Sequence, residues 1–278
     1  MAGVDFVGVG AQRSGTSWLH ACLYEHPAIC APIKELHFFS RERNYERGLD
    51  WYVGHFDRCP PGTLRGEFST SYLYAAEAAG RIRAAFPATR ILMSLRNPVD
   101  RAYSQYRNAI VAGEIAKGTA FADYARADPS VVGQGLYHEQ VRRYLDVFDS
   151  VLVLVLEDAE RDRAAFVSGV YGFLGVDPSF RPTMLDRSVN ASRTPGVVGV
   201  DRAMNRVGDV LRRAGLDGLV WRVKKSGVPE RLRRLNRGRD GESLEEAERR
   251  ELAAAFCDDA ARLSELLARD LVALWELE

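Results

Sequence analysis

Residues 10–17 combine glycines, hydroxyl side chains and one cation in a pattern that suits a phosphate or sulfate group. The segment reads, in order, Gly10, Ala11, Gln12, Arg13, Ser14, Gly15, Thr16 and Ser17, and it follows a short apolar run. A tight glycine loop between a strand and a helix points backbone N–H groups and the positive end of the helix dipole at one spot. The segment therefore predicts an anion site.

The position of the cation separates two classes of anion site. A nucleotide-hydrolysing P-loop has Lys directly after its second glycine, whereas here Thr16 follows Gly15 and the cation, Arg13, lies inside the loop. The loop resembles the 5′-phosphosulfate loop of sulfotransferases that use 3′-phosphoadenosine 5′-phosphosulfate. The resemblance implies that Arg13, Ser14, Gly15, Thr16 and Ser17 bind this group, and that Arg13 also acts in catalysis. The alternative is a kinase-like P-loop phosphotransferase that uses ATP.

A second anion site is predicted where a buried strand ends at Arg96. Asn97 should cap the next helix, which Pro98 should begin, and Ser104 lies about two turns into it. An Arg fork and a hydroxyl can together hold a phosphate. The string resembles the sulfotransferase signature that binds the 3′-phosphate, which implies Arg96 and Ser104 as its ligands. The resemblance also places Arg193 in a loop over the cofactor, either as a phosphate ligand or as an exposed side chain.

Glu35 and His37 lie in the stretch Lys34-Glu35-Leu36-His37-Phe38-Phe39. A hydroxyl that attacks a sulfuryl group needs a base within hydrogen-bond reach, and a glutamate with an ordinary pKa is ionised at neutral pH. Taken alone, the stretch favours a surface Lys–Glu pair before a buried Phe-Phe. It resembles Lys-Glu-x-His-Phe-Phe of the heparan sulfate sulfotransferase branch, which implies Glu35 as the general base. His37 is the alternative base, or a group that orients the acceptor.

One departure from that branch concerns the acceptor. The branch has Lys where this chain has Phe68, which would remove a positive charge near the acceptor. We therefore expect a smaller or less charged acceptor than a sulfated glycan, namely a hydroxyl of a small molecule, glycolipid or carbohydrate. The donor leaves as adenosine 3′,5′-bisphosphate. No metal is expected, since the loop cations and helix dipole supply the charge neutralisation that Mg²⁺ provides in kinases.

The elements that must position these residues alternate between strand and helix. An α/β fold follows, with a central parallel sheet flanked by helices on both faces and a P-loop-like nucleotide site, of the sulfotransferase type. Ligands bind such sheets at the carboxyl ends of the strands. The predicted strands are residues 4–10, 64–68, 90–95 and 151–156; the predicted helices are residues 16–25, 75–86, 134–148 and one that begins at residue 98.

Length and charge limit the organisation and the partners. The 278 residues, 46% of them apolar, predict one domain over residues 1–278. Lys plus Arg equals Asp plus Glu, 38 each, which argues against nucleic acid as a partner. Residues 198–241 are predicted as a basic helical cover over the acceptor cleft; a peripheral membrane contact through residues 202–239 is the alternative. No feature predicts an oligomeric state.

The four cysteines, Cys22, Cys30, Cys59 and Cys257, form no CxxC pair and no metal-ligand spacing. The chain begins without a secretory pattern, and its longest apolar run, residues 151–156, is far shorter than the ~20 residues that cross a bilayer. We therefore expect a soluble cytoplasmic protein with reduced thiols.

Overall fold

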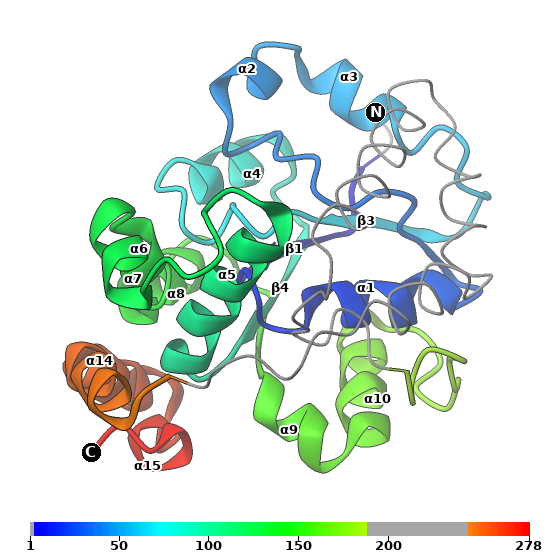
Figure 1. Cartoon of the computed structure of the whole chain (residues 1–278). Helices are drawn as coiled ribbons and strands as arrows, with labels where there is room; N and C mark the ends of the chain where they lie inside the picture. Colours follow the sequence, from blue (N-terminus) through cyan, green and yellow to red (C-terminus); the bar gives the residue numbers. More distant parts are fainter. Residues whose placement is uncertain (1–2, 188–243) are drawn as a thin grey trace. The chain divides into compact units, whose positions relative to one another are not determined.

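Five short strands pair in a parallel sheet in the order β2-β3-β1-β4-β5 (Figure 1). The computed structural model describes residues 3–187 and 244–278. The strands are β1 (Phe6–Gly10), β2 (Ile29–Cys30), β3 (Leu64–Phe68), β4 (Arg90–Leu95) and β5 (Val151–Val155). The predicted α/β fold with a parallel sheet is therefore confirmed.

At least one helix lies in every connection between consecutive strands. They are α1 (Thr16–Glu25), α2 (Glu42–Tyr45), α3 (Leu49–Gly54), α4 (Ala78–Ala85), α5 (Pro98–Ala112), α6 (Phe121–Ala127), α7 (Ser130–Gly133), α8 (Tyr137–Leu145), α9 (Leu156–Arg161), α10 (Arg163–Leu174), α14 (Glu246–Leu267) and α15 (Leu271–Trp275). A parallel strand pair needs such a crossover, because the chain must return to the same end of the sheet before the next strand begins.

The chain divides into two compact units, which are described separately. The first comprises residues 1–102, 132–190 and 250–278 and contains the whole sheet; the second comprises residues 103–131 and 191–249. In the described part of the second unit, Tyr106 packs against the rings of Phe121 and Tyr124. The single domain and the role of residues 198–241, which lie outside the described residues, stay predictions.

The core of the first unit explains why β1 lies near the middle of the sheet. All five residues of β1 are buried, and the side chains of Phe6, Leu19 and Val170 pack in one cluster formed by the sheet, α1 and α10. Burying one such side chain contributes about 2 kcal/mol. An apolar strand covered on both faces is typical of a parallel sheet, and it fixes the point at which the glycine loop leaves the sheet.

Most predicted boundaries agree with the structure to within three residues. The helix at residues 16–25 and the strands at 64–68 and 90–95 have the predicted bounds. The helix predicted over residues 134–148 is longer than the observed one, since α8 covers only Tyr137–Leu145. The strand predicted to end at residue 156 ends at Val155, because Leu156 already begins α9; as the edge strand β5 it is only partly buried.

The expectation of reduced thiols is wrong for two of the four cysteines. Cys30, at the end of β2, forms a disulfide with Cys59, 29 residues further along the chain. Cys22 and Cys257 are not in a disulfide. The sequence could not show this pair, because its contact depends on how residues 30 and 59 lie in the folded chain.

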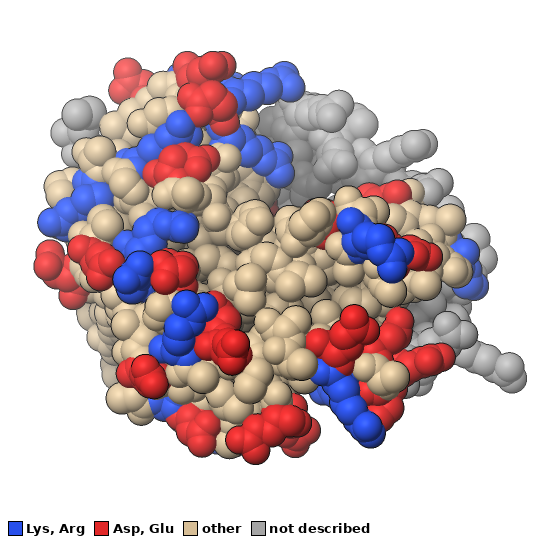
Figure 2. Space-filling model, turned by 90° about the vertical axis from the view of Figure 1, so that its left-hand side faces the viewer, with Lys and Arg blue, Asp and Glu red and all other residues tan. Residues whose placement is uncertain are grey.

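Two features of the described structure concern a membrane and charged partners, namely the hydropathy of its helices and the distribution of charge on its surface. None of the described helices is both long and apolar enough to cross a membrane. Figure 2 shows acidic and basic side chains interspersed over the face that it presents, in keeping with the equal numbers of the two charges in the sequence.

Candidate active site

The predicted anion loop lies between the end of β1 and the start of α1. Gly15, directly before α1, has a φ of +75°, and a Cβ there would lie 2.5 Å from a methyl carbon of Leu156. The left-handed backbone favours glycine, and a larger residue would also displace the end of the Leu156 side chain. In the described structure the first turn of α1 has neither an acidic residue nor a side-chain cap, so its N–H groups can bind an anion.

The hydroxyl side chains of the loop fit the same ligand. Ser14 and Thr16 are buried, and the Ser14 hydroxyl lies beside that of Tyr137, where it helps to lower the pKa of Tyr137 against the effect of burial. Ser17 is the second residue of α1. Hydroxyls at a helix N-terminus can donate to a bound oxyanion. The donor set that was predicted from the sequence is thus assembled at one helix N-terminus.

Three guanidinium groups gather at this loop. Burial lowers the pKa of Arg13, and the charges of Arg96 and Arg101 lower it further. The side chain of Arg96 donates to the backbone carbonyl of Arg13, with 3.4 Å between Nη1 and O. Arg101, which was not predicted as a site residue, is fully buried. Since like charges repel in a poorly solvated site, the arrangement favours an anion with more than one negative charge.

The second motif folds as predicted around Asn97. Its Oδ1 accepts from the backbone N–H groups of Val99 (2.9 Å) and Asp100 (3.3 Å), which is the expected helix cap. The Tyr137 hydroxyl donates to the Arg96 carbonyl over 3.0 Å. The end of β4 is therefore held firmly, and with it the backbone of Arg96.

The other predicted cofactor ligands have different outcomes. Ser104 is buried in α5 and belongs to the second unit, so its pairing with Arg96 on one phosphate stays a prediction. Arg193 lies outside the described residues.

Glu35 and His37 lie on a segment that runs beside the end of β3. The backbone N–H of Glu35 donates to the carbonyl of Phe68 over 2.6 Å, and Lys34 forms a parallel bridge with the same residue. Glu35 and His37 both have left-handed backbones, with φ of 65° and 52°. Non-glycine residues adopt this conformation at a cost and often do so at functional sites.

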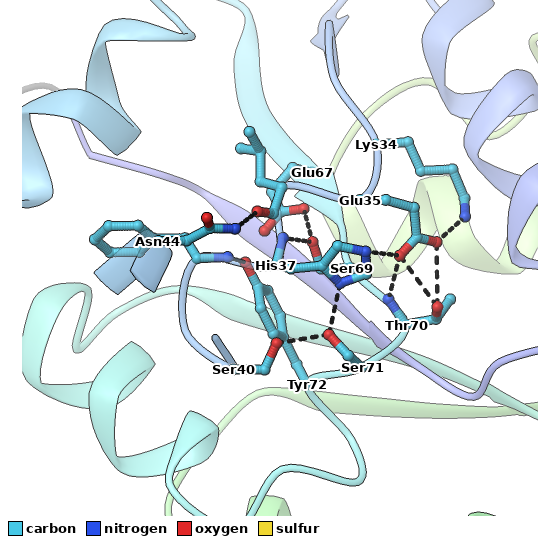
Figure 3. Close-up of polar contacts among 12 residues, drawn as sticks. Lys34, Glu35, His37, Ser40, Asn44, Glu67, Ser69, Thr70, Ser71 and Tyr72 are labelled. Atoms are coloured by element: carbon cyan, nitrogen blue, oxygen red, sulfur yellow. Dashed lines mark hydrogen bonds and ion pairs between the residues drawn. The ribbon is translucent and has the colours of Figure 1, made fainter. Parts of the chain in front are cut away.

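The Glu35 carboxylate is held by three neighbours (Figure 3). It forms an ion pair with Lys34, it accepts from the backbone N–H and hydroxyl of Thr70 at 3.1 Å, and it lies 3.3 Å from His37 Nε2. Burial acts to raise the pKa of Glu35, but the charge and hydrogen bond of Lys34, then His37 and Thr70, hold it below the ordinary value. The carboxylate is therefore ionised at neutral pH, and at 31% exposure it is accessible to an acceptor.

A contact at Nδ1, the ring nitrogen that does not face Glu35, orients the imidazole of His37. Its Nδ1 lies 2.7 Å from the Ser71 hydroxyl, which is 2.6 Å from the Ser40 hydroxyl. Burial lowers the pKa of His37, and Arg41 and Lys34 lower it further, against the opposing charge of Glu35. A neutral imidazole satisfies both contacts if Nε2–H donates to Glu35 and Nδ1 accepts from Ser71. This geometry suits a group that orients Glu35.

Sequence reasoning missed Thr70 and Ser71 as site residues. Both directly follow β3 in the stretch that ends at Tyr72, and hydroxyl residues just after a parallel strand are a signal for a site. The backbone of this stretch bonds to β1, from Ser69 N to Gly8 O (2.9 Å) and from Leu73 N to Val9 O (2.8 Å).

The two groups of residues thus lie at the same edge of the sheet. Strands β1 and β3 are adjacent and parallel, so the anion loop after β1 and the platform for Glu35 after β3 both leave from their carboxyl ends. A site for a multiply charged anion thus lies beside an ionised carboxylate. This combination is typical of enzymes that transfer a group from an anionic donor to a protic acceptor. Within residues 3–187 and 244–278, no group of three or more metal-binding side chains is placed to hold an ion.

The comparisons with known proteins identify this class. The family model of the sulfotransferase domain matches residues 4–195. The chain therefore belongs to the sulfotransferase domain family, and the predicted class, a sulfotransferase, is confirmed.

Particular relatives include a bacterial enzyme and two human ones. A sulfotransferase structure from Alicyclobacillus acidocaldarius is 29% identical with a TM-score of 0.72, over 99% of this chain and 100% of that chain. Human heparan sulfate glucosamine 3-O-sulfotransferase 6 is 34% identical over 60% of this chain, and human bifunctional heparan sulfate N-deacetylase/N-sulfotransferase 3 is 29% identical over 63% of it. The match spans 51% and 22% of the length of these two human proteins, respectively.

Proposed function

We propose that the protein transfers a sulfuryl group in line from 3′-phosphoadenosine 5′-phosphosulfate to an acceptor hydroxyl, with Glu35 as the general base. The observation that carries the proposal is the Glu35 carboxylate. It is ionised, partly exposed and fixed by Lys34, Thr70 and His37 at the sheet edge from which the anion loop also leaves. A base held in this way can accept the hydroxyl proton as the acceptor oxygen attacks sulfur.

The residues of the loop would act on the donor side. Arg13 and the N-terminus of α1 would stabilise the negative charge that develops on the transferred group and on the phosphate oxygen it leaves. Arg96 would hold the 3′-phosphate, with Ser104 as its predicted partner. The three guanidiniums that lie close to one another support this role, because an anionic ligand removes their mutual repulsion.

The structure supports a different acceptor from the one that Phe68 suggested. Phe68 is fully buried and packs against the rings of Phe6 and His20, so its side chain belongs to the core and says little about the acceptor. A groove of about 550 Å³ is instead lined by Arg41, Arg43, Asn44 and Arg47. The side-chain amide of Asn44 donates to the carbonyl of Leu36 over 2.9 Å, between Glu35 and His37.

The groove therefore adjoins the segment that carries the base. Among the described residues no carboxylate pairs with its three arginines; Glu42, which lies between two of them, pairs with Arg81 at 2.6 Å. Arg41 is also close enough to help lower the pKa of His37. Three cations without a carboxylate partner favour an anionic ligand. We infer that the acceptor, a small molecule or a glycan, carries a carboxylate, phosphate or sulfate group besides its reactive hydroxyl.

Sulfate transfer from labelled donor to a metabolite extract tests this proposal. The labelled products should need the donor and the enzyme, should be lost with Glu35→Gln, and should come from acceptors that an anion-exchange column retains. Arg41→Ala and Arg47→Ala should raise KM for such an acceptor at unchanged donor affinity. Products only from uncharged acceptors would contradict the anionic acceptor.

A thermal-shift comparison separates the sulfotransferase from a kinase-like activity. Adenosine 3′,5′-bisphosphate should raise the melting temperature more than ATP with Mg²⁺, and transfer should continue in excess chelator. Activity that is lost in chelator and restored by Mg²⁺ would favour the phosphotransferase.

A further inference from the structure

One buried carboxyl group has no part in the chemistry described above. Glu67, in β3, is fully buried, as are Tyr52, Ser69 and Tyr72 around it. The Ser69 hydroxyl donates to its Oε2 over 2.8 Å, and the Tyr52 hydroxyl faces its Oε1 at 3.4 Å. The Tyr72 hydroxyl also hydrogen-bonds to this carboxyl group. Once it is ionised, a buried carboxyl group surrounded by hydroxyls can only accept, which fixes the direction in which each hydroxyl donates.

The hydroxyls of Ser69 and Tyr72 also accept hydrogen bonds from the backbone of the segment that carries the proposed base. Ser69 Oγ accepts from the backbone N–H of His37 over 2.9 Å, and the Tyr72 hydroxyl accepts from the backbone N–H of Phe38 over 2.9 Å. A hydroxyl that donates to Glu67 is left with its oxygen free to accept from these amides. The carboxyl group of Glu67 is therefore connected, through one hydroxyl on each path, to two consecutive amides of the segment; Figure 3 marks the path through Ser69 and the bond from Phe38 to Tyr72.

We propose that Glu67 is a positioning residue for sulfuryl transfer: it orients the hydroxyls of Ser69 and Tyr72 so that they accept the amides of His37 and Phe38. These bonds hold the left-handed backbone at His37, and through the His37 ring they fix the Glu35 carboxylate. The inference rests on the proposed role of Glu35 as base. Glu67 itself touches neither Glu35 nor, by its position in the core, the acceptor.

The informative variant is Glu67→Gln, compared with the unmodified enzyme above pH 8, where the carboxyl group of Glu67 is ionised and both of its oxygens accept; Gln keeps the size and replaces one acceptor oxygen with a donor. The amide nitrogen can only donate, so it must point at one of the surrounding hydroxyls; if that hydroxyl is Ser69 or Tyr72, its bond to the backbone amide is disturbed. We expect kcat to fall on the order of 10- to 100-fold, as for a small misplacement of a catalytic group. The affinity for adenosine 3′,5′-bisphosphate should stay within about two-fold, because the anion loop is untouched.

A direct readout does not depend on activity. The imidazole NMR signals of His37, one of five histidines and assignable with His37→Gln, should move in Glu67→Gln. Ser69→Ala and Tyr72→Phe should each reproduce part of the loss in kcat, and neither should add its full effect to Glu67→Gln.

Tyr171→Phe is the matched control. It removes another buried tyrosine hydroxyl, one that donates to the Cys22 carbonyl over 2.9 Å, and it should leave kcat and the His37 signals unchanged. Unchanged His37 signals and kcat in Glu67→Gln would overturn the proposal, as would an equal loss of kcat in Tyr171→Phe. If Glu35→Gln proves fully active, the base assignment fails, while the His37 signals still decide whether Glu67 positions the segment.

Discussion

Replacing Glu67 with Gln should change how the stability of the protein depends on pH. Burial raises the pKa of Glu67 to about 8; the hydrogen bonds of Tyr72, Ser69 and Tyr52 oppose this effect, and the charge of Glu35 adds to it. In the unfolded chain the group titrates near 4.5. Between these two values the folded protein binds more protons than the unfolded chain, so the free energy of unfolding must fall as pH rises and level off above about pH 8.

The size of the effect follows from the two pKa values of Glu67. A difference of one in pKa corresponds to about 1.4 kcal/mol. The free energy of unfolding that the protein loses because of Glu67, relative to low pH, is therefore roughly 1 kcal/mol at pH 5 and approaches a value on the order of 5 kcal/mol above pH 8. Gln cannot ionise and avoids this loss. The free energy of unfolding of Glu67→Gln minus that of the unmodified protein should therefore increase by about 3–4 kcal/mol between pH 5 and pH 8.

Urea unfolding at pH 5, 6, 7 and 8 measures this difference. The titratable groups that face Glu67 are Tyr52 from α3, Tyr72 after β3 and Glu35; all three are present in both proteins, and burial raises the pKa of both tyrosines well above this range. Glu160→Gln, which changes an exposed glutamate of α9, is the control and should parallel the unmodified protein. Parallel curves for Glu67→Gln as well would mean that Glu67 is ionised in the folded state, and would refute the reasoning.

Four further outcomes are expected. Arg13→Ala should lower turnover by ~10²–10³ with less damage to the binding of adenosine 3′,5′-bisphosphate; normal turnover would exclude Arg13 from catalysis. Arg96→Ala should abolish the preference for that ligand over adenosine 5′-phosphate, as measured by calorimetry. Cys59→Ser should cost about 3 kcal/mol of unfolding free energy, because it opens a disulfide that closes a loop of 29 residues; adding reductant to the unmodified protein should give the same loss. Glu35→Gln should lose ~10²-fold or more in turnover with fold and donor affinity kept, and the unmodified enzyme should lose activity through Glu35 only as pH falls below 4.5, since its pKa lies below that value. If His37→Gln is dead and Glu35→Gln is active, the base is His37.

The parts of the fold that the sequence predicted well are those with local signals. Gly15 before Thr16, and Asn97 before Pro98, mark where helices begin, and the apolar run of residues 90–95 marks a strand. Each signal depends on the residue's own backbone preference or on neighbours within one turn. The anion loop was predictable for the same reason, because its donors are consecutive in the chain.

The parts that could not be predicted depend on pairing between distant strands. Thr70 reaches Glu35 only because the stretch after β3 lies beside both residue 35 and the end of β1, and the register of β3 on β1 is set by their buried side chains. The same pairing buries the side chain of Phe68 in the core, which its position in the sequence does not reveal. No pattern within a few residues distinguishes a strand residue that lines a site from one that fills the core.

The backbone conformation of the predicted catalytic residues shows why local sequence preferences do not predict the structure of the site. Among the described residues five that are not glycine have a positive φ, and Arg13, Glu35 and His37 are three of them. Arginine, glutamate and histidine do not favour this conformation, so its cost of about 1–3 kcal/mol each must be offset by contacts made elsewhere. For His37 these contacts are the hydroxyls of Ser69 and Ser71. Three of these five residues are ones whose function is proposed, which is expected if the surrounding structure is built to hold them in place.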